Sequence, residues 1–359
     1  MRISPTHPVP DVTATRMKVE STLLHREAAE AADTVARQLE RNGAVVRKLA
    51  AGLRDHAPPF VATCARGSSD HAATYAKYVI ETQTGCVTAS ASPSIESIYS
   101  VPLRLRDALY IVISQSGASP DLLRSAEAAR TAGARVVALV NAEDSPLAAL
   151  ADTVIPLQAG PEKSVAATKS FIGSLSAVLH LVAHWRQDEV LIKALQGLPD
   201  QLRHAFELDW SPLVDGLRDM HDLFVLGRGY GLGAAQEAAL KLKETCALHA
   251  EAFSSAEVRH GPMELVGPRL PVLLFAQQDH ALAGVLATAE DFRRRGADVW
   301  TAAPLATGRN ALPVVPTEHP VCAPILAVQS FYRAVNALAI ARGRDPDHPP
   351  HLAKVTETV

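Results

Sequence analysis

Short apolar runs alternate with helix-like stretches along most of this chain. Runs rich in Val, Ile and Leu occur at residues 60–65, 108–115, 135–141 and 152–157. The segments between them, such as 71–84 and 121–133, have the composition and spacing of helices. Continuous apolar runs between helices are typical of parallel strands that are covered on both faces. The pattern therefore predicts an α/β fold in which a parallel sheet is flanked by helices.

The same succession of elements occurs twice. Gly229 follows Gly67 by 162 positions, and the apolar run at 270–277 follows the run at 108–115 by the same number. A third pair of runs is separated by 163 positions. Because common α/β architecture would produce the alternation but not a constant spacing, we predict a duplication.

The duplication divides the chain into two similar halves, each expected to be a flavodoxin-like three-layer sandwich. A helix is predicted over 14–54, where Ala, Leu, Arg and Glu predominate. We expect an N-terminal helical segment, a first α/β half, a linker, a second half and a C-terminal tail, at 1–45, 46–190, 191–214, 215–340 and 341–359.

Composition narrows the class of protein. The 359 residues are 48% hydrophobic and 20% charged, as in a globular protein with a sizeable core, and the net charge of −3 offers no basic excess for nucleic acid. The four cysteines lack disulfide or metal spacing, so we expect a reducing, cytoplasmic location. The longest apolar stretch, 170–185, is too short and too polar for a membrane span and is expected to be a buried helix.

Hydroxyl side chains gather where the strands of the first half are predicted to end. These turns contain Gly67, Ser68 and Ser69, then Ser114, Gln115, Ser116, Gly117 and Ser119, and finally Thr168. Ligands of open parallel sheets bind beyond the carboxyl ends of the strands, and phosphates favour helix N-termini and small hydroxyl donors. One such turn would most simply be a helix cap. Three of them favour a phosphomonoester site.

No cofactor or metal is expected from the motifs. A dinucleotide fingerprint and a P-loop are both missing, and the glycine-rich stretch at 227–233 lacks the required spacing. Two prolines interrupt the group of possible metal ligands in the tail, which are Asp345, Asp347, His348 and His351.

The second half contains candidate proton-transfer groups. If 234–248 is one helix, Lys241 and Glu244 share a face, because they are three positions apart. Such a pair is often a surface ion pair, but this helix is otherwise apolar, so we expect it to be partly buried and able to act in proton transfer. His260, in the loop before Gly261 and Pro262, would add a group that titrates near neutral pH.

Several motifs, taken together, resemble the double SIS (sugar isomerase) proteins. They are SQSG at 114–117, VAATKSF at 165–171, ALKLKE at 239–244, HAEAF at 249–253, RHGP at 259–262 and HLAKVTETV at 351–359. The chain is similar in particular to the isomerase half of glucosamine-6-phosphate synthases, from about residue 60 to the C-terminus.

The resemblance implies a binding site for a small sugar phosphate. The phosphate would be bound by Ser69, Ser114, Gln115, Ser116 and Ser119, and the sugar would lie against Gly67, Val165 and Ala167. Two residues at or near the sugar depart from the synthase pattern, because the synthases have Ser where this chain has Ala167 and differ at Arg66.

The resemblance also implies roles for four catalytic residues. Glu244 would move a proton between C1 and C2 of the open-chain sugar, with Lys241 near the sugar hydroxyls. His260 would assist ring opening and would come from the partner subunit of a homodimer. Lys354 would bring the tail over the site, as an amine that can form an imine with a ketose or hold the open chain.

The synthases begin with a glutaminase domain, whereas only about 45 residues precede the first half here. We therefore expect isomerising deamination of glucosamine 6-phosphate, giving fructose 6-phosphate and ammonia. Alternatives are plain aldose–ketose isomerisation, or action on galactosamine 6-phosphate or fructosamine 6-phosphate. A regulator that binds a sugar phosphate without turnover is a further alternative, although such regulators usually carry a DNA-binding or docking segment.

Overall fold

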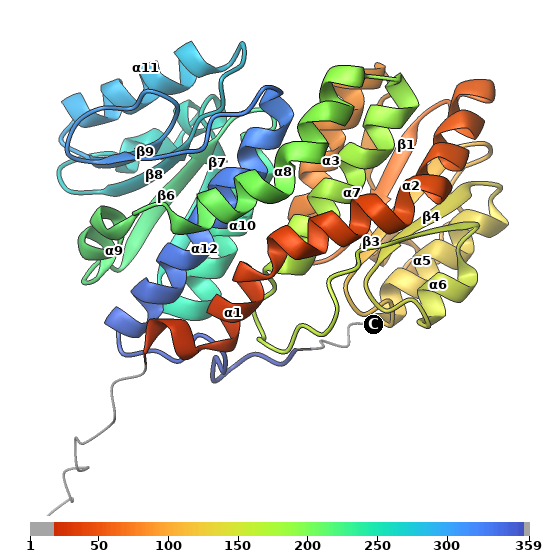
Figure 1. Cartoon of the computed structure of the whole chain (residues 1–359), viewed down its shortest axis with the longest axis horizontal. Coiled ribbons are helices and arrows are strands. Elements are labelled where there is room, and N and C mark those ends of the chain that lie inside the picture. The colour runs from red at the N-terminus through yellow and green to blue at the C-terminus, as the bar shows by residue number, and fades with distance from the viewer. Residues whose placement is uncertain (1–17, 355–359) are drawn as a thin grey trace, which may run out of the picture.

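The computed structural model of the chain describes residues 18–354 and contains two parallel five-stranded sheets with helices between and outside them (Figure 1). The first sheet has the order β2-β1-β3-β4-β5, with β1 Val61–Cys64, β2 Thr88–Ser90, β3 Leu109–Ser114, β4 Arg135–Val140 and β5 Thr153–Pro156. The second has the order β10-β9-β8-β6-β7, with β6 Asp222–Gly227, β7 His249–Ser254, β8 Pro271–Phe275, β9 Asp298–Ala302 and β10 Ala311–Leu312. The predicted α/β fold is confirmed.

The register of the strands confirms that the two halves are equivalent. In the first sheet Val61 pairs with Leu109, 48 positions further on, and in the second Phe224 pairs with Val272, again 48 positions further on. Read from β7, the second sheet has the strand order of the first. The regular spacing found in the sequence is therefore the spacing of matched strands.

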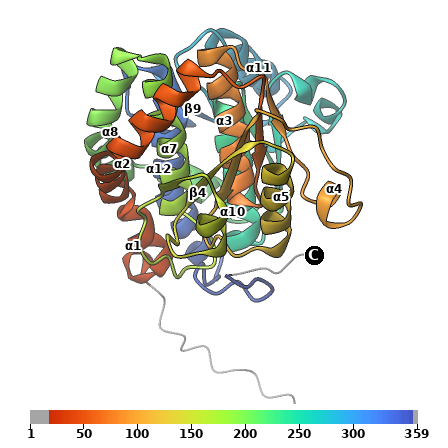
Figure 2. The same cartoon turned by 90° about the vertical axis from the view of Figure 1, so that its right-hand side faces the viewer.

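Side chains alternate between the two faces of each sheet. The inner faces of both sheets belong to one continuous core, built with α2 Ala31–Asp55, α3 Ser68–Thr84, α7 Lys169–Arg186, α10 Gly231–Cys246 and α12 Ala323–Ala341. The outer faces are covered by α5 Pro120–Thr131 and α6 Pro146–Leu150 in the first half, and by α11 Leu282–Arg294 in the second. Figure 2 shows α5 on the outer side of the first sheet.

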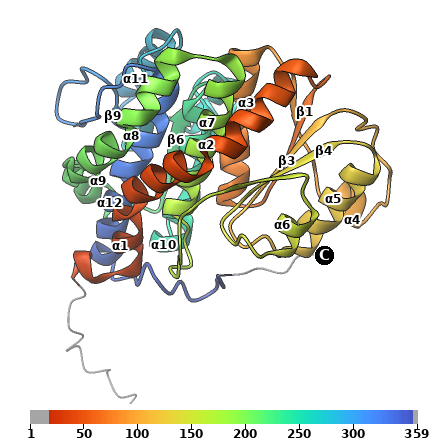
Figure 3. The same ribbon diagram turned by 45° about the vertical axis from the view of Figure 1, so that its right-hand side comes forward.

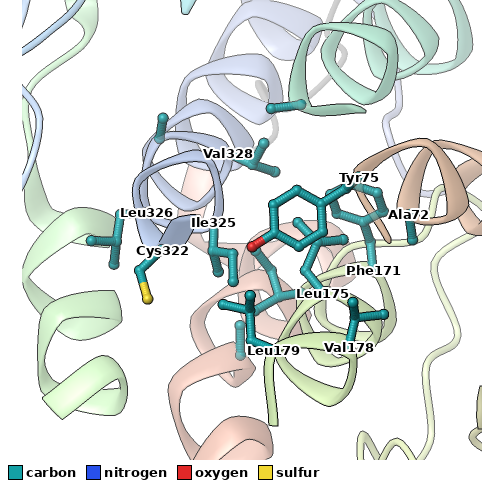
Figure 4. Close-up of a cluster of buried hydrophobic side chains, with 14 of the residues drawn as sticks. Ala72, Tyr75, Phe171, Leu175, Val178, Leu179, Cys322, Ile325, Leu326 and Val328 are labelled. Carbon is teal, nitrogen blue, oxygen red and sulfur yellow. The ribbon is translucent and has the colours of Figure 1, made fainter. Parts of the chain in front are cut away.

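The central helices join the halves through apolar packing. Figure 4 shows Tyr75 of α3 among side chains of α7 and α12, including Phe171 and Val328. Tyr75 is fully buried, and its hydroxyl donates a 2.6 Å hydrogen bond to the Val321 carbonyl. In α10, a Cβ on Gly233 would lie 2.6 Å from the His71 carbonyl oxygen of α3, so only glycine permits this approach of the two helices.

The prediction of one continuous N-terminal helix needs correction. The predicted helix over 14–54 is two helices, α1 Leu23–Ala29 and α2, that meet at Glu30, and α2 continues past the predicted boundary at 45. This break lets α1 pack beside α12 (Figure 3). Residues 14–17 lie outside the described part of the chain.

The predicted linker at 191–214 consists mainly of helix α8 Glu189–Glu207, followed by the start of α9 Ser211–Leu217. Helix α8 buries an apolar face that contains Leu191, Leu195, Leu198 and Leu202, so the connection is part of the core. The sequence reasoning also missed strands β2 and β7 and the short helix α4 Ser94–Ser97.

The tail beyond α12 runs along the edge of the molecule toward the first sheet (Figure 1). Both carboxylate oxygens of Asp347 accept hydrogen bonds from the first backbone N–H groups of α1, those of Leu23 and Leu24, at 2.7 and 2.8 Å.

The segment 320–341, which contains α12, is long and apolar enough to cross a membrane, but its apolar window is 83% buried, as in a core helix. The last five residues of the HLAKVTETV motif lie outside the described part.

Candidate active site

A cavity of about 370 Å³ lies at the carboxyl ends of β1 and β3. Helix α10 of the second half and the tail also contribute to its wall. The lining brings together ten of the twelve site residues predicted from the sequence, namely Gly67, Ser69, Ser114, Gln115, Ser116, Ser119, Val165, Ala167, Glu244 and Lys354. Segments almost 290 positions apart in the sequence thus meet in one cavity.

The loop from Ser114 to Ser119 forms the hydroxyl-rich end of the cavity. It leaves β3 and ends at Ser119, the residue before α5, so that backbone N–H groups of the first turn lie beside the hydroxyls. Gly117 has a φ of +63°, and a Cβ there would lie 2.2 Å from Ser145 Oγ. The Ser114 hydroxyl accepts a 3.0 Å hydrogen bond from the Gly117 N–H, which fixes the turn.

A second helix N-terminus lies on the same side. Gly67, with a φ of +55°, turns the chain from β1 into α3, which places Ser68 and Ser69 in the first helical turn. Two helix N-termini and several hydroxyl groups therefore line one end of the cavity, an arrangement suited to an anion such as a phosphate.

The loop before α7 carries Val165 and Ala167 and is anchored by two carboxylates. Glu162, whose side chain is fully buried, accepts hydrogen bonds from the N–H groups of Thr168 and Ser170 at 3.0 and 3.1 Å. Glu27 of α1 accepts bonds from the N–H groups of Lys163 and Ser164 at 2.5 and 3.1 Å.

The same loop receives the tail. Lys354 Nζ donates a 2.7 Å hydrogen bond to the Ser164 carbonyl and lies 3.4 Å from Glu162 Oε2. The amine of Lys354 is therefore held at the wall of the cavity.

Glu244 lines the cavity from the last turn of α10, with its side chain 20% exposed. Lys241, one turn earlier, donates a hydrogen bond to Glu244, as the spacing predicted. Lys241 itself is fully buried and does not line the cavity: it lies behind Glu244, where Nζ is 3.1 Å from Ser68 Oγ and 3.4 Å from Glu237 Oε1. We expected Lys241 near the sugar hydroxyls, whereas it supports Glu244 from the protein interior.

Glu237 is a buried residue that the sequence reasoning missed. Its carboxylate accepts hydrogen bonds from Ser68 at 3.2 Å and from the Tyr332 hydroxyl at 3.0 Å, and it lies 3.2 Å from His71 Nδ1. Glu237 is four positions before Lys241 in an apolar helix, which was an available signal. His71 and Tyr332 come from α3 and α12, so nothing in the local sequence linked them to this group.

Burial and charge act in opposite directions on this pair. Burial raises the pKa of Glu237, but Lys241 and His71 outweigh it and the pKa is lowered. Burial lowers the pKa of Lys241, but Glu237 and Glu244 outweigh it and the pKa is raised. Both groups are thus charged at neutral pH, and the buried ammonium of Lys241 also donates a hydrogen bond to Glu244.

His260 does not join this cavity within one chain. It is exposed, it follows the short helical turn Glu257–Arg259, and it is not part of the lining around Glu244. Among residues 18–354, no group of three or more His, Cys, Asp or Glu side chains is arranged to hold a metal ion.

The equivalent position in the second half is built differently. Adding the offset of 162, Ala276 stands where the first half has Ser114, and Ala281 stands where it has Ser119. Gln277 turns inward and donates 2.8 Å hydrogen bonds to the Arg228 carbonyl and to Asp279. The cavity there is about 30 Å³, too small for a sugar.

The fold and the cavity define a tandem α/β protein with a candidate site at the carboxyl ends of strands of the first sheet. The sequence pattern described as the SIS domain matches residues 61–184 and 216–340, one match in each half, and the chain belongs to the SIS domain family.

Curated relatives and a solved structure extend the comparison. The chain is 33% identical over 311 residues to glutamine–fructose-6-phosphate aminotransferase [isomerizing] of Symbiobacterium thermophilum, covering 82% of this chain and 51% of that protein. It is 32% identical to the enzyme of the same name from Thermus thermophilus, covering 88% and 54%. The chain thus spans about half the length of these relatives.

A crystal structure from Silicibacter pomeroyi, of a protein assigned provisionally as a phosphosugar isomerase, is 44% identical, with a TM-score of 0.87. The match covers 91% of this chain and 100% of that one.

Proposed function

We propose that this protein is an enzyme that isomerises an amino-sugar phosphate and releases its nitrogen, converting glucosamine 6-phosphate and water to fructose 6-phosphate and ammonia. The observation that carries the proposal is the single cavity that joins a hydroxyl-rich anion site to Glu244 and Lys354. A phosphate bound at the two helix N-termini would fix one end of an open-chain sugar and hold its reacting carbons for proton transfer.

The reaction follows from a carboxylate placed at C1 and C2. Glu244 takes the proton from C2 of the open-chain aldehyde and returns it to C1, while a proton moves from the nitrogen to O1. The product is a C2 imine with a hydroxymethyl group at C1. Water adds to the imine carbon, the C–N bond breaks, and the ketose and ammonia are formed.

The names of the relatives support an amino sugar as the substrate. The Symbiobacterium and Thermus enzymes are named for isomerising transfer of an amino group to fructose 6-phosphate. In the direction of nitrogen release, water is the only second substrate required. Plain aldose–ketose isomerisation of a neutral phosphosugar uses the same proton transfer and is the second candidate.

Ammonia and ketose formation from purified protein test the proposal. We expect both products from glucosamine 6-phosphate, with galactosamine 6-phosphate, fructosamine 6-phosphate and neutral hexose 6-phosphates assayed in parallel. Ketose–aldose exchange without ammonia would replace the deaminase by an isomerase. Tight binding of the sugar phosphates with no product from any of them would identify a regulator.

We also propose that the active enzyme is a homodimer in which His260 completes the site of the partner subunit. His260 is exposed in one chain and lies outside the cavity that contains Glu244, although ring opening requires an acid–base group near the sugar.

Mixing two inactive variants, His260→Asn and Glu244→Gln, tests this assembly. Subunit exchange forms heterodimers with one intact site, so activity should recover to about a quarter of the wild-type value. If the mixture stays inactive after subunit exchange has been verified, His260 does not act across the interface.

A further inference from the structure

Positive charge is scarce around the anion end of the cavity. Of the described residues that line it, Arg66 and Lys354 carry a formal positive charge, and Lys354 is turned to the Ser164 carbonyl and Glu162. The hydroxyl groups and the helix N-termini contribute only partial charges. A phosphate monoester carries a charge of about −1.5 to −2 at pH 7, so a full positive charge near it would contribute strongly to binding.

Arg66 is held at this end by a buried carboxylate. Its Nε and Nη2 atoms lie 2.9 and 2.8 Å from Asp121 Oδ2. Asp121 is 1% exposed and belongs to the first turn of α5, two residues after Ser119, and its Oδ1 accepts the Leu122 N–H. Arg66 precedes Gly67 and Ser69, so its ion pair with Asp121 joins the turn before α3 to the first turn of α5.

The ion pair with Asp121 leaves part of the Arg66 guanidinium available for a ligand. The Arg66 side chain is 50% exposed, and the third guanidinium nitrogen, Nη1, is not engaged by Asp121. Arginine presents donors in a planar fork that matches phosphate oxygens, and holding two of its nitrogens reduces the conformational freedom lost on binding.

We propose that Arg66, positioned by Asp121, binds the phosphate of the substrate and selects its dianionic form. This rests on the proposed function, in which a sugar phosphate occupies the cavity. Arg66 would thereby discriminate phosphorylated sugars from free sugars. The uncharged serines alone would give weaker discrimination.

Binding of fructose 6-phosphate and of inorganic phosphate by calorimetry tests Arg66 without requiring turnover. Arg66→Ala should weaken fructose 6-phosphate binding by about 10- to 100-fold, as expected for loss of a charge-assisted hydrogen bond. The affinity of Arg66→Lys should lie between those of the wild type and Arg66→Ala, because lysine keeps the positive charge but lacks the planar pair of donors. Arg124→Ala, which removes an exposed arginine of α5 outside the cavity, should bind like the wild type.

The pH dependence separates a phosphate ligand from a structural residue. Wild-type binding should tighten as pH rises through the second phosphate pKa of about 6, and this tightening should diminish in Arg66→Ala. If the unpaired Asp121 carboxylate unfolds that variant, the double variant Arg66→Ala/Asp121→Asn removes the buried charge and allows the same measurement.

Unchanged affinity in a folded Arg66 variant would overturn the proposal, as would an equal loss at every pH or wild-type protein that binds neither probe. This test is independent of the proposed reaction. Arg66-dependent binding without ammonia release would exclude the deaminase reaction and retain Arg66 as a phosphate ligand. Ammonia release that Arg66→Ala does not affect would support the deaminase reaction and exclude this role of Arg66.

Discussion

Replacing Glu244 by Gln is expected to abolish product formation while the sugar phosphate still binds. Gln keeps the size of the side chain and can accept the hydrogen bond from Lys241, but it cannot take a proton from carbon. Removing a positioned general base typically lowers the rate by about 10²- to 10⁴-fold. The measurement is kcat for ammonia and ketose formation, together with the affinity for fructose 6-phosphate.

A matched control is Glu251→Gln, which neutralises an exposed carboxylate of β7 outside the cavity and should leave kcat unchanged. Affinity for fructose 6-phosphate should remain within about twofold in both variants, because the phosphate end of the cavity is intact. Substantial activity in Glu244→Gln would remove the assigned proton transfer. Lost binding with unaltered turnover at saturation would reassign Glu244 to substrate binding.

Among the variants considered, Lys241→Met is expected to lower the free energy of unfolding the most. Lys241 and Glu237 are both fully buried, and removing one partner of a buried ion pair typically costs about 3–5 kcal/mol because the other charge is left uncompensated. The double variant Lys241→Met/Glu237→Gln should recover part of this loss, since the amide is neutral. Urea unfolding midpoints of the two variants measure the difference.

The pH dependence of this loss has a defined sign. In the wild type, the lowered pKa of Glu237 gives stability that is lost only as pH falls through it, and the raised pKa of Lys241 gives stability that is lost only as pH rises through it. Without Lys241, burial favours the protonated Glu237 carboxyl, so stability falls as pH rises. The deficit relative to the wild type should therefore grow from about pH 5 to pH 7. A deficit that is constant with pH would indicate lost packing.

Much of the fold could be predicted because its strongest signals are local. Strands β1, β3, β4 and β8 are apolar runs buried on both faces, and the constant spacing between the runs of the two halves indicates the duplication. The edge strands β2 and β7 were missed because β2 has three residues and β7 alternates with exposed positions. The segment predicted as a linker is mostly helix α8, which accommodates Pro199 in its interior.

For the candidate site, too, the local sequence signals were informative and the long-range contacts were not. The residues that follow β1 and β3 in recognisable motifs do line one cavity. The buried polar group behind Glu244 could not be predicted from the sequence. Its members Glu237, His71 and Tyr332 come from three helices that meet only through packing of the two halves. The resemblance implied that Lys241 lies near the sugar hydroxyls, whereas spacing established only which face of α10 it shares with Glu244 and not how deeply that face is buried.

The close contact at Gly233 bears on how the protein can move. Helices α3 and α10 touch there without an intervening side chain, and each carries part of the site. Sliding one helix past the other would drive backbone into backbone, so shear motion between the halves is opposed at this point. We therefore expect opening and closing of the cavity to involve the tail, whose residues Leu352–Lys354 form part of its wall and belong to neither sheet.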